Sequence, residues 1–463
     1  MKSFRTRGSQ LTVREKSIQN LNALVSGIQS NRNIQLFLIA LILVGITLFT
    51  FLYSILSNGV LQFNGSASYI DIAKNIATKG LYSLNGTDPT AYRAPVYPFY
   101  LSLWVWLFGG QFAFPAQFVQ SLFDLATGVL IVLISLNVFQ SKLAAGISFL
   151  LYAIHVAFHL EAIAMRETVL FAFLTAAFFY LISLNRRSFL QYVLLSALAA
   201  LLYLTRATGV VAVFFVFLDL LKHRGNFRTF LVNAMLIVAT AFLIIFPWQQ
   251  FVYENFHTLS FTPTSVGGHT LYYGNNPDFA TISPYIDIDK YQPYIREILS
   301  ENGIDYNDEV AHDQFMRTLA VNYIKEHPVL FVRNAFIKLF ALYSPLHTPL
   351  GSGDLVGPLG SVKIENFRFS TLTTSLIGFP AVLLILIGVF LYVWQTLASR
   401  KVTWTEFLIY LFVGFVTGLH LLYHAESRFR YPIDPLLILL AGSAYANVLR
   451  NQKSLPFQER TQD

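Results

Sequence analysis

Two things are scarce in this sequence: cysteine is absent from its 463 residues, and only 12% of them are charged. Without cysteine, disulfide bonds and thiolate chemistry are excluded. Soluble domains average about 25% charged residues, so a soluble fold of this length would lack the polar surface that it needs. The sequence therefore predicts a membrane protein.

Apolar and aromatic residues are in excess. Hydrophobic residues make up 55% of the chain and aromatics 16%, with 43 Phe and 24 Tyr. This enrichment is typical of lipid-facing helices and of interfacial aromatic belts. The net charge of +7 comes from basic residues scattered between apolar runs. Basic residues in short loops between apolar runs indicate which loops face the cytoplasm. The positive charge therefore does not indicate a nucleic-acid partner.

A transmembrane helix needs roughly 20 apolar residues. Suitable runs lie near 35–57, 116–138, 142–160, 168–184, 189–205, 207–222, 229–252, 372–397, 406–424 and 432–448. Two further runs are ambiguous, because 98–110 is short and 328–345 carries Arg333 and Lys338. Placing the basic loops in the cytoplasm requires both ambiguous runs to be interfacial helices. The sequence thus predicts an all-α polytopic bundle with about ten spans and both termini inside.

The spans divide the chain into unequal parts. The predicted parts are a cytoplasmic tail (1–34), a transmembrane module (35–252) with a first outer loop (58–115), an extracytoplasmic loop region with an interfacial helix (253–371), C-terminal transmembrane helices (372–448) and a cytoplasmic tail (449–463). Long loops are usually functional or disordered. These are rich in Tyr, Gly and Pro without low-complexity tracts, so we expect them to be folded.

Charged residues gather at the outer ends of the predicted helices. They are Asp71, Arg93, Glu161, Arg166, Glu167, Arg206, Glu426, Arg428 and Arg430. One interpretation is that they are solvated or that the arginines snorkel to head groups. The other is that several cations surround one outer cavity, where arginine binds phosphate with bidentate geometry. Charge in every short outer turn favours the second interpretation, with an isoprenoid tail between the helices.

Several segments match one family of membrane enzymes. They are YIDIA at 69–73, GLY at 80–82, YRAPVYP at 92–98, MRETVL at 165–170, LTRATG at 204–209, PW at 247–248, GGHTLYYGNNP at 267–277 and RFRYPIDP at 428–435. In this order the segments resemble motifs of the membrane glycosyltransferases of the C-type (GT-C) fold. The chain looks closest to bacterial glycosyltransferase family 39, which is grouped with dolichyl-phosphate-mannose protein mannosyltransferases and the lipid A aminoarabinose transferase. The match covers about residues 35–448.

The resemblance implies transfer of a sugar from a polyprenyl-phosphate donor to an acceptor on the outer face, with inversion at the anomeric carbon. It implies that Arg93 and Arg206 bind the donor phosphate, with Arg430 as a second-rank candidate. It implies a bacterial inner-membrane enzyme whose site faces outward. The implied partners are the lipid-phosphate donor, the bilayer and a glycan, lipid or protein acceptor that the sequence does not specify.

The resemblance also implies residues of the substrate loops. Tyr69 belongs to the first outer loop. Gly268, Asn275 and Asn276 belong to the large loop, where a purely structural turn is the alternative interpretation.

The catalytic carboxylate is the point where this chain departs from the family pattern. The family's acidic residue, four positions before the tyrosine that matches Tyr69, is replaced by Gly65. Glu167 matches another acidic position of the family and is the first candidate, although an ion pair with a neighbouring arginine is an equal interpretation. Asp71 is the substitute base, with a solvated loop aspartate as its alternative.

Two other function classes stay open from the sequence. A transporter or flippase of a lipid-linked substrate would use the same cationic cavity, but transporters usually place charges at mid-helix, and the sequence indicates none there. An inactive accessory subunit would explain Gly65. No cofactor is implied with certainty. A divalent metal is left open, because His420 and His424 share a helix face near Glu426, yet they do not form a convincing ligand set.

Overall fold

The computed structural model describes residues 66–162, 164–184, 187–258, 262–279, 288–345, 352–355, 364–368, 371–399 and 402–453. The predicted N-terminal tail, the first predicted span and Gly65 lie outside the described residues.

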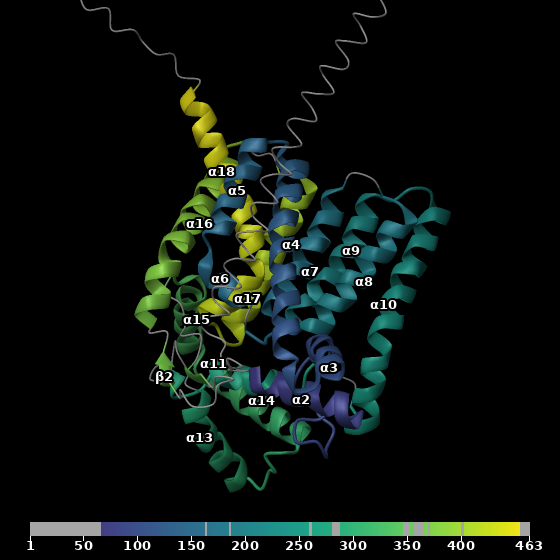
Figure 1. The fold of residues 1–463 in the computed structure, drawn as a ribbon, viewed down its shortest axis with the longest axis vertical. Coiled ribbons are helices and arrows are strands. Elements are labelled where there is room, and N and C mark those ends of the chain that lie inside the picture. Colours follow the sequence, from purple (N-terminus) through teal and green to yellow (C-terminus); the bar gives the residue numbers. More distant parts are fainter. Residues whose placement is uncertain are drawn as a thin grey trace, which may run out of the picture. The chain divides into compact units, whose positions relative to one another are not determined.

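Helices dominate the described chain (Figure 1). In order they are α2 (Ser66–Lys79), α3 (Val96–Phe108), η1 (Gly109–Gln111), α4 (Ala113–Phe139), α5 (Lys142–Ala153), α6 (Val156–Leu160), α7 (Thr168–Ser183), α8 (Phe189–Thr205), η2 (Ala207–Gly209), α9 (Val210–Lys222), α10 (Phe227–Phe256), α11 (Gly267–Gly274), α13 (Ile288–Glu301), α14 (Glu309–Glu326), α15 (Pro328–Tyr343), α16 (Thr371–Ser399), α17 (Trp404–Leu422), η3 (Ser427–Ile433) and α18 (Asp434–Lys453). A short antiparallel pair, β1 (Ser352–Leu355) with β2 (Ile364–Arg368), accompanies them.

Within the described residues, five helices are long and apolar enough to cross a membrane, so the chain is a multi-pass membrane protein. They are Ala113–Phe139, Phe227–Phe256, Gly378–Ser399, Trp404–Leu422 and Ser427–Arg450. Apolar helices of 10–17 residues cover three more predicted spans: Lys142–Ala153, Thr168–Ser183 and Phe189–Thr205. The ten-span topology stays a prediction.

One predicted span is divided. The run 142–160 forms α5 and α6 instead of one helix, with a break at Ile154 and His155. His155 is fully buried, and its Nε2 lies 2.7 Å from Asp434 Oδ2. Because this contact fixes the side chain of His155 against α18, the local backbone leaves the helical path (φ −81°, ψ 62°).

The core lies around α18, which packs against α5, α16 and α4. Its apolar residues are almost fully buried, including Leu436, Ile438 and Leu440. A second row of neighbours runs from α4 through α7 and α8 to α9 and α10. In contrast, α10 packs chiefly on α8 and exposes Phe242 and Leu243, which suits a helix that faces lipid.

Asp219 of α9 ties three helices together at one end of this row. Its fully buried carboxylate accepts bonds from Arg187 Nε (2.6 Å) and Nη2 (2.9 Å) and from the Trp404 indole (3.0 Å). His223 Nδ1 lies 3.3 Å away. Arg187 follows α7 and Trp404 begins α17, so one carboxylate joins α7, α9 and α17. We name these four residues the Asp219 knot.

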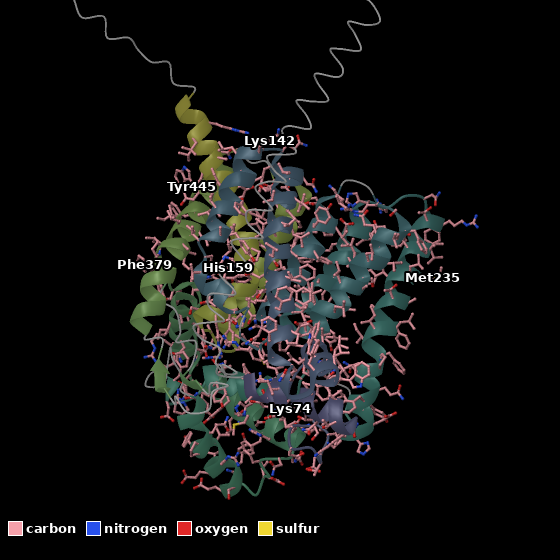
Figure 2. The ribbon with its side chains drawn as sticks, viewed as in Figure 1. Lys74, Lys142, His159, Met235, Phe379 and Tyr445 are labelled. Carbon is pink, nitrogen blue, oxygen red and sulfur yellow. The ribbon has the colours of Figure 1, made fainter. Side chains whose placement is uncertain are left out.

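The segments predicted as outer loops form a second layer of helices. Figure 2 places Lys74 of α2 and Lys142 of α5 toward opposite ends of the bundle, with His159 between them. Helices α2, α3, α11 and α14 gather at the Lys74 end (Figure 1), where α2 packs on α3 and α11 packs on α14. Their described parts are folded, as expected.

Candidate functional site

Arg93 follows the first outer turn and reaches back to α2. Its Nε donates to Ser68 Oγ (2.9 Å), and its guanidinium carbon lies 4.7 Å from the Tyr69 ring centroid and 4.8 Å from that of Tyr92. The Tyr82 hydroxyl donates to the Arg93 carbonyl (2.9 Å) and fixes the backbone there. Aromatic faces hold the cation while leaving guanidinium N–H groups available for an anion.

Glu167 immediately precedes α7 and faces Arg93 and Arg206. Burial acts to raise the pKa of the Glu167 carboxyl, but the charge of Arg206, the hydrogen bond from Tyr69 and the charge of Arg93 outweigh it, so the pKa is lowered. The start of a helix also favours a negative charge. Glu167 is therefore an anion, and the charges of two arginines stabilise it.

Tyr69 is the neutral partner of this carboxylate. Burial raises the pKa of its hydroxyl, and the Glu167 charge adds to that. The phenol therefore stays protonated and donates its hydrogen bond to Glu167.

Arg206 ends α8 in an extended conformation (φ −158°, ψ 137°) that turns it out of the helix. Its guanidinium carbon lies 5.1 Å from the Phe429 ring centroid. Burial and the charge of Arg428 lower the pKa of Arg206 more than the charge of the Glu167 carboxylate raises it. Two guanidinium groups thus act electrostatically on one carboxylate, and together they carry one positive charge more than it balances.

Asp71 is not part of this group. It is exposed on α2, whereas Tyr69, Ile70, Ile72 and Ala73 are buried. Two residues along a helix turn through about 200°, so Asp71 and Tyr69 project to opposite sides. The structure does not bring the two predicted carboxylates together, and the role of Asp71 as base stays a prediction.

Arg430 also lies outside the group. It is 1% exposed, its Nε bonds to Asp434 Oδ1 (2.8 Å), and its Nη1 bonds to the carbonyls of Leu342 (3.2 Å) and Ser344 (3.1 Å). Among the described residues, none of these contacts involves Tyr69, Glu167 or Arg206. This is the geometry of a structural ion pair that joins η3 to the end of α15.

The large-loop motif has a structural role. A Cβ at Gly268 would lie 2.0 Å from the Asp313 carbonyl oxygen, and one at Gly274 would lie 1.6 Å from that of Tyr423. The Asn275 side chain donates to the carbonyls of Leu271 and Leu422, both at 2.8 Å. These contacts hold α11 against α14 and against the end of α17.

The remaining motif residue, Asn276, closes its own turn. Its Nδ2 donates to the Tyr272 carbonyl (2.8 Å), and its Oδ1 accepts from the Asp278 amide (2.9 Å).

Lys338 joins the same region from α15. Its amine donates to Asn275 Oδ1 (3.2 Å) and to the carbonyls of Leu421 (3.0 Å) and Leu422 (3.3 Å). Burial lowers the pKa of this amine to about 7. In the sequence, the charge of Lys338 only made the run 328–345 a doubtful span. No sequence pattern predicted that its amine would join α15 to Asn275 and to the end of α17.

Three further polar groups were not predicted. Glu309 of α14 accepts bonds from Thr90 Oγ1, from the Ala91 amide (2.9 Å) and from Ser265 Oγ (2.6 Å), and so holds the loop before Arg93. Gln120 of α4 donates to the carbonyls of Glu161, Ala162 and Ala164, and so holds the turn before Glu167. The sequence could have indicated a role for Gln120, because a polar amide is unusual within an apolar run.

The third group corrects the expectation of no charge at mid-helix. Asp124 lies within α4, and its Oδ2 is 2.7 Å from His159 Nδ1. The Tyr152 hydroxyl donates to the same carboxylate.

The turn after α17 carries a separate cluster. His424 Nε2 lies 2.9 Å from Glu426 Oε1, and Arg428 Nε lies 2.7 Å from Glu426 Oε2. His420 Nδ1 bonds to the His424 carbonyl (2.9 Å). In the part of the chain that the structure describes, no group of three or more His, Cys, Asp and Glu side chains is arranged to hold a metal ion.

Comparison with known proteins gave only distant likenesses. No family model and no curated protein matches the sequence. Oligosaccharyltransferase AglB from Archaeoglobus fulgidus, in complex with an inhibitory peptide and a dolichol-phosphate, is 13% identical over 85% of this chain and 47% of its own, with a TM-score of 0.45. The apo form of the Archaeoglobus fulgidus oligosaccharyltransferase is 15% identical over 89% and 51%, with a TM-score of 0.48.

ArnT from Cupriavidus metallidurans, bound to undecaprenyl phosphate, is 14% identical over 90% of this chain and 78% of its own, with a TM-score of 0.39. This chain spans about half the length of the two oligosaccharyltransferase chains. These identities and TM-scores do not establish the activity of this chain.

Proposed function

We propose that this protein transfers a sugar from a polyprenyl-phosphate donor to an acceptor at the outer face of a bacterial inner membrane. The observation that carries the proposal is the electrostatic grouping of Arg93 and Arg206 with Glu167 and Tyr69, at the ends of α7 and α8. One carboxylate does not balance two guanidinium groups, so a phosphate completes the charge.

In this reaction the chain's own residues stabilise the leaving group. As the anomeric carbon passes through an oxocarbenium-like state, the lipid phosphate gains negative charge. Arg93 and Arg206 are fixed before the reaction by aromatic faces and by Glu167, so they stabilise that charge without rearranging. A single displacement inverts the anomeric centre, and the acceptor hydroxyl gives its proton to a base within hydrogen-bond reach.

The test measures free polyprenyl phosphate by mass spectrometry. The purified protein is incubated with a panel of polyprenyl-phosphate sugars and a crude envelope acceptor fraction. Wild type should release polyprenyl phosphate, and Arg206→Ala and Arg93→Ala should lose at least about 100-fold in rate, as expected when a fixed donor to a developing charge is removed. Arg224→Ala, an exposed arginine at the turn before α10, is the matched control and should retain full activity.

One observation favours a second candidate, movement of a lipid-linked substrate. The Asp124–His159 pair inside the bundle provides a titratable group at the depth where transporters place them. Transport without release of polyprenyl phosphate in proteoliposomes would replace the first proposal. An accessory subunit would instead require a second chain for any release.

A further inference from the structure

The turn between α17 and η3 carries a histidine whose protonation pattern is fixed by its neighbours. His424 Nε2 lies 2.9 Å from Glu426 Oε1, and both side chains are buried, at 6% and 4% exposed. A carboxylate accepts hydrogen bonds, so Nε2 carries the proton. In the neutral imidazole the other nitrogen, Nδ1, then has a free lone pair.

That lone pair has no partner. His424 Nδ1 is buried, and among the described residues it makes no hydrogen bond. Buried polar atoms are nearly always paired, so an unpaired one calls for an explanation. A buried acceptor of fixed tautomer, supported by a carboxylate, is the arrangement of a proton acceptor that waits for a donor.

Glu426 is suited to support such a histidine. Burial acts to raise the pKa of its carboxyl, but the charge of Arg428 and the contacts with His424 lower it to about 2. The carboxylate is therefore ionised at any working pH, and it stabilises the imidazolium that forms when His424 takes a proton.

The turn lies beside the proposed phosphate site. The Phe429 ring packs on His424 (centroids 5.7 Å apart, edge to face) and on His420 (5.0 Å, stacked). The guanidinium carbon of Arg206 lies 5.1 Å from the centroid of the same ring. One aromatic ring thus contacts both the arginine proposed for the leaving phosphate and the histidine with the free lone pair.

The other carboxylate of the site is less suited to act as a base. The charges of Arg206 and Arg93 and the hydrogen bond from Tyr69 lower the pKa of Glu167, which makes it a weak proton acceptor. Asp71 is exposed on the far side of α2.

We propose that His424 is the general base of the transfer reaction and that Glu426 positions it, in place of the acid missing at Gly65. The inference rests on the proposed function. The acceptor oxygen bonds to the anomeric carbon as the bond from that carbon to the phosphate oxygen breaks. The electron pair leaves with the polyprenyl phosphate, and the acceptor proton moves to Nδ1. Because Nδ1 is buried and the Phe429 ring packs on His424, this step requires Phe429 to move aside for the acceptor.

Several charged or titratable groups surround His424. Glu426 and Arg428 lie on its own turn, and His420 faces it from α17. Arg206 approaches from α8 through Phe429. Lys338 approaches from α15 and bonds the carbonyls of Leu421 and Leu422 just before the turn.

The experiment compares full-length wild type, His424→Ala, His424→Gln and Glu426→Gln, with His257→Asn as the control at an exposed histidine. Rates and KM for the donor found in the panel are measured across the pH range, with and without added imidazole. Thermal melting and binding of polyprenyl phosphate are measured for each variant to test whether it is folded.

We expect His424→Ala to lower kcat about 100-fold or more, the usual contribution of a general base, while donor KM stays unchanged and free imidazole partly restores the rate. Glu426→Gln should shift the pH profile, which a purely structural role would not do. The inference is overturned if a folded His424 variant keeps its kcat, or loses it without rescue by imidazole. Absence of release by wild type with every donor would instead refute the proposed function itself.

Discussion

Replacing Glu309 should loosen the loop that carries Arg93 without unfolding the bundle. The Glu309 carboxylate accepts bonds from Thr90, from the Ala91 amide at 2.9 Å and from Ser265 at 2.6 Å. Hydrogen bonds to charged groups contribute about 1.5–3 kcal/mol each. Glu309 is half-buried and water replaces part of the loss, so we take about 3 kcal/mol for Glu309→Ala. That free energy corresponds to a roughly 100-fold rise in local opening.

Amide hydrogen exchange measures this directly, because the Ala91 amide is one of the three donors. Exchange of a peptide spanning 85–95 should accelerate about 100-fold in Glu309→Ala and about 10-fold in Glu309→Gln, which keeps one acceptor oxygen. Glu297→Ala, an exposed carboxylate on α13, is the control and should leave exchange unchanged. An acceleration below about threefold in Glu309→Ala would refute the reasoning, since the loop would then be held by other contacts.

Three further outcomes follow from contacts at other points of the fold. Asp219→Ala leaves the Arg187 guanidinium buried without its partner, so we expect a loss of about 3–5 kcal/mol, seen as a lower Tm in detergent; an unchanged Tm would contradict it. Burial lowers the pKa of Lys338 from 10.5 to about 7. Between these values the unfolded chain binds more protons than the folded one, so Tm should rise with pH above 7, and Lys338→Met should remove that rise. Gly274→Ala places a methyl group 1.6 Å from the Tyr423 carbonyl oxygen, so α11 must move away from the end of α17 and the Tm should fall. A Tm equal to that of wild type would refute the close approach.

The sequence predicted the spanning elements well, because hydropathy over about 20 residues follows directly from the solvent. The predicted runs 116–138, 229–252, 372–397 and 406–424 agree with α4, α10, α16 and α17 to within a few residues. The break between α5 and α6 was missed, because it depends on a contact between residues 155 and 434 that no local pattern records.

The site residues stay a prediction. Arg93, Arg206 and Glu167 were named from motifs, and in the structure both arginines and Tyr69 influence the Glu167 carboxyl electrostatically. The sequence analysis also named Arg430 as a second-rank ligand of the phosphate. Its ion pair with Asp434 could not be predicted from the positions of charged residues in the sequence alone. The supporting residues Glu309 and Gln120 left little signal, since their partners are backbone groups and hydroxyls from distant segments.

The Asp219 knot has a mechanical consequence. Glu167 precedes α7 and Arg187 follows it, so the knot and the arginine pair lie at opposite ends of a helix of 16 residues, about 24 Å apart. Helices pinned together at one end swing about that end, and the same small rotation moves their free ends furthest. A rotation of these helices about the knot would therefore displace the end of α7 that carries Glu167 further than the end that leads to Arg187.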